Sequence, residues 1–261
     1  MDLLALDVGN TSVTAAGFAG DPRITPSFAH HRVRGADEPE ELAAWTTIVA
    51  ALAPVQVVVG SVHRFGAVLA SALRARHFAR AAEFPLRCAL PPPHTVGVDR
   101  LAAALAAWCD HPGGALCVNA GTAITVDWVD AHGAFRGGAI VPGRLLQAKA
   151  LRLHTDLLPE IAPWAGGPLA LPGMTTEEAI RHGLDAGVPG MVDRLLVRLA
   201  AATGSGAVPI VVSGGDAEWL GARLETPHRR EPWLVARGLA LAARGSHATG
   251  RTAADAGGAP A

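Results

Sequence analysis

The sequence predicts an α/β fold built from two similar subdomains that face each other across a cleft. Each half of the chain begins with an apolar run, a glycine turn and a second strand-like run, at residues 3–18 and again at residues 115–129. Helical patterns follow these strands in both halves, as in domains that cover a sheet with helices. The predicted subdomains are residues 1–114 and 115–245. Residues 246–261 are small and polar, and we expect them to form a disordered tail.

In the first half, Leu3–Asp7 is a short apolar run that ends at a glycine turn, which predicts a buried strand. Thr11–Phe18 is rich in β-branched and small residues and predicts its hairpin partner. Glu40–Leu52 has apolar residues at helical spacing and acids in its first turn, which favour a helix start. The other predicted elements are a third strand, a Val-rich strand, a helix with a basic outer face and an alanine-rich helix that needs close packing, at residues 24–33, 55–59, 65–78 and 98–108.

The second half repeats this order. Ala115–Val118 predicts a buried strand that runs into a glycine turn, and two further strands flank the turn Asp130–Gly133. Thr175–Ala202 predicts a long helical region that is broken near Gly187–Gly190, because glycine and proline interrupt helices. The remaining predicted elements are strands at residues 123–129, 134–141 and 210–213, and helices at residues 145–157, 217–224 and 233–243.

Composition excludes several classes of protein. The chain has 261 residues, of which 50% are hydrophobic, and its 22 basic and 23 acidic residues give a net charge of -1. This balance predicts no nucleic-acid partner and no anionic membrane partner. No apolar run approaches the roughly 18 residues of a membrane helix, and the N-terminus lacks the pattern of a secretory signal. The three cysteines, Cys88, Cys109 and Cys117, form no CxxC pair, so we expect a reduced, cytoplasmic protein without structural zinc.

Two glycine turns are the first candidate binding elements, Asp7–Thr11 and Asn119–Ala123. Glycine lets a backbone approach a ligand closely, and the N–H groups of such a turn can bind an anion. One such motif alone is more often an ordinary hairpin turn, but two copies in matching positions favour a shared ligand. The one lysine, Lys149, is far from any glycine loop, which excludes a lysine-containing P-loop.

Three further motifs each allow two interpretations. In Gly97–Arg100, Asp99 is either a helix cap or a general base, with Arg100 binding a carboxylate. Gly137–Gly143 is either a bulged strand with its exit turn or a backbone surface for a nucleotide. Ser213–Asp216 ends a strand and opens a helix, a position suited to ribose or phosphate.

Taken in chain order, these motifs closely resemble those of the type III pantothenate kinases, of the actin/Hsp70/sugar-kinase superfamily. The resemblance implies two ribonuclease-H-like, actin-like ATPase subdomains that flank a nucleotide cleft. It spans about residues 3–243, and Gly97–Arg100 after a proline-containing loop is its most specific part. The matching segments are Asp7–Thr11, Gly60–Val62, Gly97–Arg100, Gly121–Thr125, Gly137–Gly143, Thr175–Gly183 and Ser213–Asp216.

The resemblance implies ATP-dependent phosphorylation of pantothenate to 4′-phosphopantothenate, the first step of coenzyme A synthesis. It also implies Mg²⁺, a monovalent cation (K⁺ or NH₄⁺) and a homodimer with its pocket near the subunit interface. Asp7 would orient Mg²⁺ through the phosphates. The ATP-binding residues that it implies are Asp7, Val8, Gly9, Asn10, Thr11, Ser12, Val13, Thr14, Gly121 and Thr122.

The same resemblance implies the pantothenate site. Asp99 looks like the base that takes the hydroxyl proton, and Arg100 would lie near the carboxylate of pantothenate. Thr176 would be a further substrate contact, and His154 would line the same pocket. Gly97, Val98, Asp99 and Arg100 together would bind the substrate.

The chain departs from the family pattern at three places. Asn119 stands where the family has the Asp that serves the monovalent cation, and it keeps a carbonyl oxygen but not the charge. No tyrosine is present, although the family commonly has one in the loop before Gly97. Thr14 replaces a basic side chain often found after the first turn.

Two other functions therefore stay open: a kinase of the same fold for another small hydroxy acid, and a non-catalytic, dimeric regulatory homologue. The presence of Asp7, Asp99 and Arg100 together favours an enzyme.

Other polar and aromatic residues receive structural interpretations. We expect His30 and His31 on an exposed strand, and residues 229–230 in a solvated surface turn. The tryptophans at helical positions are expected in the core or at an interface. They are Trp45, Trp108, Trp219 and Trp233.

Overall fold

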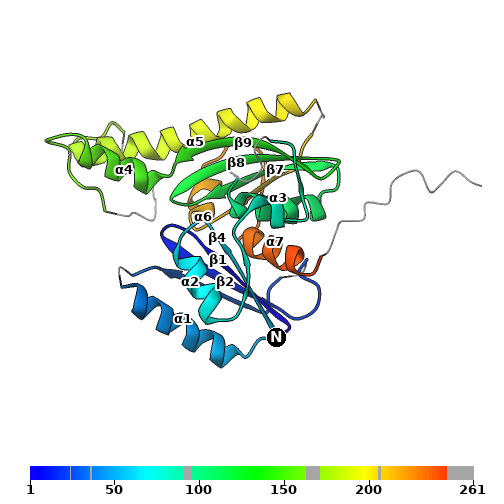
Figure 1. The fold of residues 1–261 in the computed structure, drawn as a ribbon. Helices are drawn as coiled ribbons and strands as arrows, with labels where there is room; N and C mark the ends of the chain where they lie inside the picture. The colour runs from blue at the N-terminus through cyan, green and yellow to red at the C-terminus, as the bar shows by residue number, and fades with distance from the viewer. Residues whose placement is uncertain (24, 36, 91–95, 163–170, 205–206, 246–261) are drawn as a thin grey trace, which may run out of the picture.

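The computed structural model describes residues 1–23, 25–35, 37–90, 96–162, 171–204 and 207–245. Within these ranges the chain forms two mixed β-sheets, one above the other, with helices between them and on their outer faces (Figure 1). The predictions for the tail at residues 246–261 and for the proline loop at residues 91–95 lie outside the described residues.

The first sheet has the strand order β3-β2-β1-β4-β5. β1 pairs with β2 in antiparallel fashion through the first glycine turn, β2 pairs with β3 in the same way, and β1, β4 and β5 run parallel. The predicted hairpin is therefore confirmed. The strands are β1 (Leu3–Val8), β2 (Ser12–Phe18), β3 (Phe28–Val33), β4 (Gln56–Ser61) and β5 (Arg76–Phe78).

The second sheet repeats this topology, because β9-β8-β7-β10-β11 stand in the same order and with the same directions. This repeat confirms the predicted α/β fold with two similar halves. A short sixth strand, β6 (Arg87–Cys88), extends the sheet beside β9. The other strands are β7 (Gly114–Ala120), β8 (Ala123–Asp130), β9 (Ala134–Pro142), β10 (Ile210–Ser213) and β11 (Arg229–Arg230).

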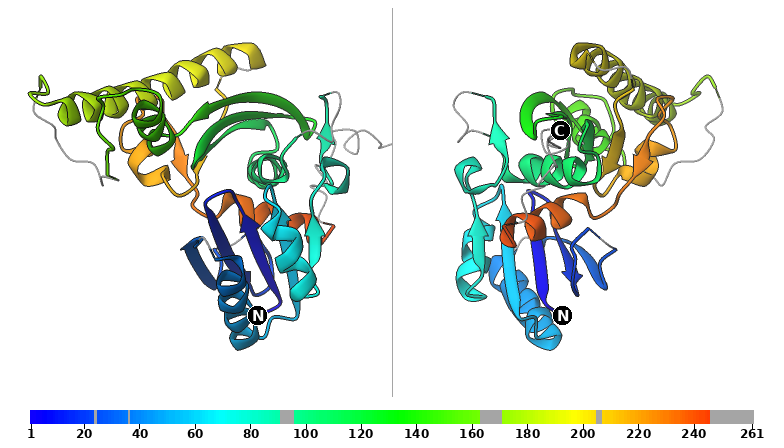
Figure 2. Two further views of the ribbon diagram at one scale, coloured as in Figure 1. Left: turned by 60° about the vertical axis from the view of Figure 1, so that its left-hand side comes forward. Right: turned by 90° about the vertical axis from the view of Figure 1, so that its right-hand side faces the viewer.

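Two helices, α3 (Val98–Asp110) and α7 (Leu234–Ala243), form a layer between the two sheets (Figures 1 and 2). Each half of the chain sends one element to the other half's sheet, because β6 pairs with β9 and α7 packs on β1, β2 and β4. The boundary at residues 114 and 115 stays a prediction. The outer layers hold α1 (Glu38–Leu52), α2 (Phe65–Ala72), α4 (Arg144–Leu153), α5 (Thr176–Thr203) and α6 (Ala217–Gly221).

Alternation along the central strands decides which side chains face the middle layer. In β1, Leu3 and Ala5 belong to the core cluster around α3 and α7, whereas Leu4 and Leu6 belong to the cluster under α1 and α2. Because successive side chains point to opposite faces, Asp7 faces the middle layer. In β7, Ala115 and Cys117 belong to that same central cluster, so Asn119 also faces the middle layer.

The alanine-rich helix α3 packs closely against α7, as its composition predicts. All residues from Leu101 to Ala107 are buried, and a Cβ added at Gly238 of α7 would overlap the carbonyl oxygen of Ala102. Small side chains on both helices thus allow near backbone contact, which holds the two sheets at a fixed spacing.

Gly238→Val is expected to lower the free energy of unfolding by roughly 3 kcal/mol, because it overpacks a backbone contact that cannot yield easily. Gly187→Ala in α5 is the control, since a Cβ there meets no atom within 4 Å. It should leave stability unchanged or raise it by up to about 1 kcal/mol. Urea denaturation measures both, and equal stability of the two variants would contradict close packing at α3–α7.

Three expectations about elements are corrected. The helix predicted for residues 65–78 ends at Ala72, because Arg74 adopts a left-handed φ of 50°, and the chain then enters β5. α5 is not broken near Gly187–Gly190 but is continuous through Pro189. Apart from Pro189, its buried residues recur every four positions and anchor it on the second sheet: Ile180, Leu184, Val188, Val192 and Leu196. Residues 229–230 form a strand rather than a turn, although both are exposed.

Among the described residues, no helix combines the length and the apolar character needed to cross a bilayer.

Candidate active site

The two glycine turns meet at the carboxyl ends of β1 and β7. The hydroxyl oxygens of Thr11 and Thr122 lie 2.7 Å apart, although 111 residues separate them in the sequence. Each turn follows the middle strand of the five-strand order that the two sheets share. The repeated motif in the sequence therefore becomes a pair of facing loops, the arrangement expected of a shared ligand site.

A largely buried arginine that sequence reasoning missed holds the first turn. Arg34 donates its backbone N–H to the carbonyl of Thr11 at 2.8 Å, and its Nη1 donates to the carbonyls of Asn10 at 3.2 Å and Gly9 at 3.4 Å. Its side chain is 10% exposed and its guanidinium lies 5.1 Å from the centre of the Phe65 ring. Nothing in a single sequence distinguishes this arginine from the others.

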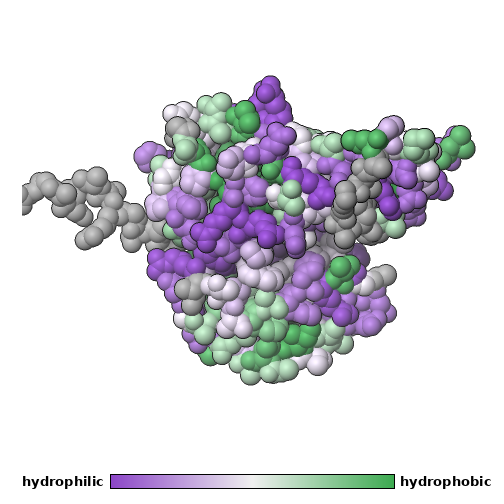
Figure 3. Space-filling view, turned by 180° about the vertical axis from the view of Figure 1, so that it is seen from behind, coloured by the Kyte–Doolittle hydropathy of each residue, from purple (hydrophilic) through white to green (hydrophobic). Residues whose placement is uncertain are grey.

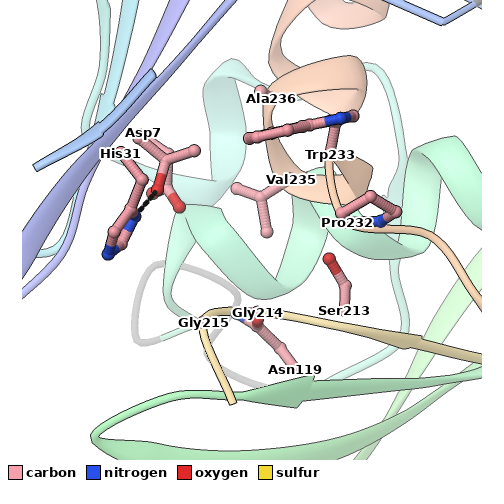
Figure 4. Close-up of a pocket in the computed structure, with 11 residues that line it drawn as sticks. Asp7, His31, Asn119, Ser213, Gly214, Gly215, Pro232, Trp233, Val235 and Ala236 are labelled. Carbon is pink, nitrogen blue, oxygen red and sulfur yellow. Dashed lines mark hydrogen bonds between the residues drawn. The ribbon is translucent and has the colours of Figure 1, made fainter. Parts of the chain in front are cut away.

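A cavity of about 290 Å³ opens beside the turns (Figure 4). Three neighbouring strands of the first sheet and the turn after β10 line two of its walls, and the start of α7 lines the third. Gly214 has a φ of 99°, and a Cβ there would overlap the backbone of Ala120, so this turn requires glycine. The lining residues are Asp7, Thr14, His31, Asn119, Ser213, Gly214, Gly215, Pro232, Trp233, Val235 and Ala236.

Two residues with structural interpretations also line the cavity. Trp233, which we expected in the core or at an interface, lines the cavity at the start of α7. His31 is on an exposed strand as expected, but it also lines the cavity. Trp45 and Trp219 are buried, as expected.

Asp7 is an uncompensated carboxylate at the cavity wall. Burial, and secondly the negative charge of Asp99, raise the pKa of Asp7 to about 7. Among the described residues Asp7 forms no ion pair, and no cluster of three or more metal-ligating side chains exists. Such a carboxylate suits Mg²⁺, which proteins commonly hold through one or two carboxylates together with phosphate oxygens and water.

Asp99 lies in the first turn of α3, whose N-cap is Gly97. Asp99 is therefore not the N-cap residue of α3. Its Oδ1 nevertheless accepts a hydrogen bond from the backbone N–H of Arg100 at 2.9 Å. Burial raises the pKa of Asp99, and the negative charge of Asp127 adds to the rise, while the bond from Arg100 N–H opposes it. A carboxylate with a raised pKa is a stronger base for a hydroxyl proton.

Arg100 forms a largely buried ion pair with Asp127, which sequence reasoning also missed. Its Nε lies 3.0 and 3.1 Å from the two carboxylate oxygens, and its Nη2 donates to Oδ1 as well. The side chains are 14% and 2% exposed. The sequence signal that could have revealed Asp127 is an acidic residue inside the apolar strand β8. Its register partner on β9 is Gly138, and any larger residue at position 138 would overlap the backbone of Val126.

Gly97→Ala is expected to lower kcat at least about tenfold with little loss of stability. The reason is that a shift of a catalytic group by about 1 Å can lower the rate about a hundredfold. A Cβ at Gly97 would lie 2.5 Å from Oδ1 of Asp99 and would displace that carboxylate. Gly113→Ala, where a Cβ meets no atom within 4 Å, is the control. Equal activity of the two variants would show that the position of the Asp99 carboxylate is unimportant.

The remaining predicted residues fall into two groups. Val8, Val13 and Val98 are buried, so their side chains are not exposed to a ligand. Thr176 begins α5 and His154 ends α4, and both are exposed on the arm that these helices form (Figure 2). Neither residue lines the cavity beside Asp7.

The chain matches known proteins over most of its length. The family model described as type III pantothenate kinase matches residues 3–198. A type III pantothenate kinase of Halorhodospira halophila is 36% identical over 90% of this chain and 95% of its own length, and one of Chlorobaculum tepidum is 34% identical over 82% and 83%. One of Rhodopirellula baltica is 44% identical, and there the match spans 56% of this chain and about half, 54%, of that relative.

Solved structures share the fold at low identity. The activator of the 2-hydroxyisocaproyl-CoA dehydratase from Clostridium difficile, with bound ADPNP, has a TM-score of 0.55 and 13% identity, and the match covers 94% of this chain and 96% of that one. A ROK family glucokinase from Streptomyces griseus, in complex with glucose and AMPPNP, has a TM-score of 0.51 and 11% identity, over 93% and 98%. These likenesses establish an actin-like ATPase and sugar-kinase fold.

Proposed function

The chain belongs to the type III pantothenate kinase family, and from this premise we propose that it transfers the γ-phosphate of ATP to the primary hydroxyl of pantothenate. The product is 4′-phosphopantothenate, and the reaction begins coenzyme A synthesis. The observation that carries the proposal is the contact between Thr11 and Thr122, because it brings together two anion-binding turns beside the cavity wall that holds Asp7. Phosphoryl transfer depends mainly on such positioning and on charge stabilisation.

The two turns bind the phosphates of ATP through the backbone N–H groups around Gly9 and Gly121 and the hydroxyls of Thr11 and Thr122. A second hollow of about 380 Å³ shares Gly214, Gly215 and Pro232 with the cavity beside the turns, which leaves room for the nucleoside. Asp7 holds Mg²⁺ together with the phosphates. When bound, Mg²⁺ neutralises charge on the transferring phosphoryl group.

Asp99 acts as the general base. It takes the proton from the primary hydroxyl while the hydroxyl oxygen bonds to the γ-phosphorus, and the bond from that phosphorus to the bridging oxygen breaks to release ADP. Gly97, Val98 and Arg100 form the surrounding pantothenate site. The ion pair with Asp127 fixes the orientation of Arg100, whose guanidinium faces the carboxylate of pantothenate.

The finer features of the family complete the proposal. The side-chain carbonyl oxygen of Asn119, at the cavity wall, serves as a ligand for K⁺ or NH₄⁺. The protein acts in the cytoplasm, which agrees with its three free thiols.

A homodimer brings the exposed arm of one protomer to the site of its partner, where Thr176 and His154 contact pantothenate. The support for this dimer is the apolar surface of the arm, formed by α4, α5 and the segments that flank them. Hydrophobic residues appear along the arm in the space-filling view (Figure 3). Leu157 is 93% exposed and Met174 is 83% exposed, and Leu153 and Leu171 are also exposed. Exposed apolar patches of this kind mark protein interfaces.

The direct test measures ADP release by the purified protein with ATP, Mg²⁺ and K⁺, with pantothenate compared against other small hydroxy acids. We expect release that depends on pantothenate. Release with a different acid would instead support the kinase of the same fold for another substrate. No release with any acid, in K⁺ or NH₄⁺, would contradict the kinase and favour a regulatory homologue.

A further inference from the structure

Three side chains stand in one row across the first sheet. Asp7 of β1 is the register partner of Thr14 of β2, and Thr14 is the register partner of His31 of β3. Directly opposite residues of antiparallel strands point to the same face of a sheet, so all three face the middle layer. Nδ1 of His31 lies 2.8 Å from the hydroxyl of Thr14, and this contact appears as the dashed line in Figure 4.

A cavity that binds the phosphates of ATP needs hydrogen-bond donors to the phosphate oxygens. Its described lining carries the carboxylate of Asp7, and His31 supplies the one basic side chain among its described lining residues. The arginines nearby have other partners, and the proposed function assigns Arg100 to the carboxylate of pantothenate. Arg34 donates to the carbonyls of the first turn, Arg100 pairs with Asp127, and Arg144 pairs with Asp216 at 2.8 Å.

We propose that His31 is a phosphate-binding residue of this chain, which donates from Nε2 to a phosphate oxygen of ATP. The Thr14 hydroxyl donates to Nδ1 of His31, which keeps the ring proton on Nε2 and fixes the orientation of the ring. The third strand of the sheet thus provides the basic side chain that Thr14 does not. This inference rests on the proposed function only in that the ligand is a nucleoside polyphosphate.

The test compares binding of ATP, ADP and adenosine to the purified protein by calorimetry, without pantothenate. His31→Leu keeps similar bulk and removes the donor, so ATP and ADP should bind about tenfold more weakly while adenosine binding stays the same. His31→Lys restores a donor and should recover most of the ATP affinity. His30→Leu is the matched control, because His30 lies on the same strand, points to the opposite face and packs edge-on against Trp45.

The binding results either support or overturn the contact between His31 and phosphate. A loss for ATP and ADP but not adenosine, with recovery in His31→Lys, supports the phosphate contact. An equal loss for adenosine, or no loss for ATP, overturns it. Because these measurements need no turnover, a wild-type protein that binds ATP but does not phosphorylate pantothenate would refute the proposed function and leave the assignment of His31 intact. A wild-type protein that binds no ATP would overturn both.

Discussion

Asp99→Asn lowers kcat by at least about a hundredfold and leaves ATP affinity within about twofold of wild type, if Asp99 is the base. Asparagine has the same shape and keeps an oxygen that can accept the N–H of Arg100, but it cannot take a proton from a hydroxyl. The raised pKa of Asp99, which burial and the charge of Asp127 produce, is the property that the substitution removes. Steady-state kinetics at saturating pantothenate measures the change.

The matched control is Glu40→Gln, which also removes an acid from the first turn of a helix, at an exposed position of α1. Both variants lose a similar favourable interaction with the helix dipole, worth up to about 1 kcal/mol. A loss of activity confined to Asp99→Asn assigns the effect to chemistry. Near-normal turnover of Asp99→Asn would show that Asp99 is not the base and serves only in the first turn of α3.

Asp7→Asn produces the second large effect, a loss of Mg²⁺-dependent turnover of at least about a hundredfold together with a gain in stability at high pH. The pKa of Asp7 is raised from 3.8 to about 7, so the folded protein binds this proton more tightly than the unfolded chain does. The stability that the bound proton provides is complete below about pH 4 and is lost as the pH rises through about 7. Asparagine carries no charge and removes that loss.

Thermal unfolding at several pH values checks this prediction. Above about pH 7, ligand-free Asp7→Asn should melt a few °C above wild type, since 1 kcal/mol corresponds to about 2–4 °C at this chain length. Near pH 4 the two should melt together. The control is Asp2→Asn, at the residue that precedes the start of β1, and its melting temperature should follow that of wild type at every pH. An Asp7→Asn curve with the pH dependence of wild type would contradict the raised pKa.

The sequence predicts the parts of this fold that short-range pattern determines. Leu3–Asp7 and Ala115–Val118 are apolar runs bounded by glycine turns, and their repetition was enough to expect two similar halves with facing turns. Side chains along a strand point alternately to its two faces, so once β1 is placed in the sheet, Asp7 must face the middle layer.

Long-range pairing explains what the sequence did not reveal. The partner of Arg100 is Asp127 on a strand of the second sheet, and the contact of Thr14 with His31 depends on the register of β2 with β3. A single sequence carries no record of either. The continuity of α5 through Pro189 follows from packing on the second sheet, which outweighs the local tendency of proline to interrupt a helix.

Identification of the reaction product tests whether this protein phosphorylates pantothenate. Wild-type protein is incubated with ATP, Mg²⁺, K⁺ and pantothenate, and the product is examined by mass spectrometry and ³¹P NMR. We expect wild type to form pantothenate with one phosphate on its primary hydroxyl, and Asp99→Asn to form no detectable product in the same time. Unmodified pantothenate after complete incubation, or ADP formed at equal rates with and without pantothenate, would contradict this expectation.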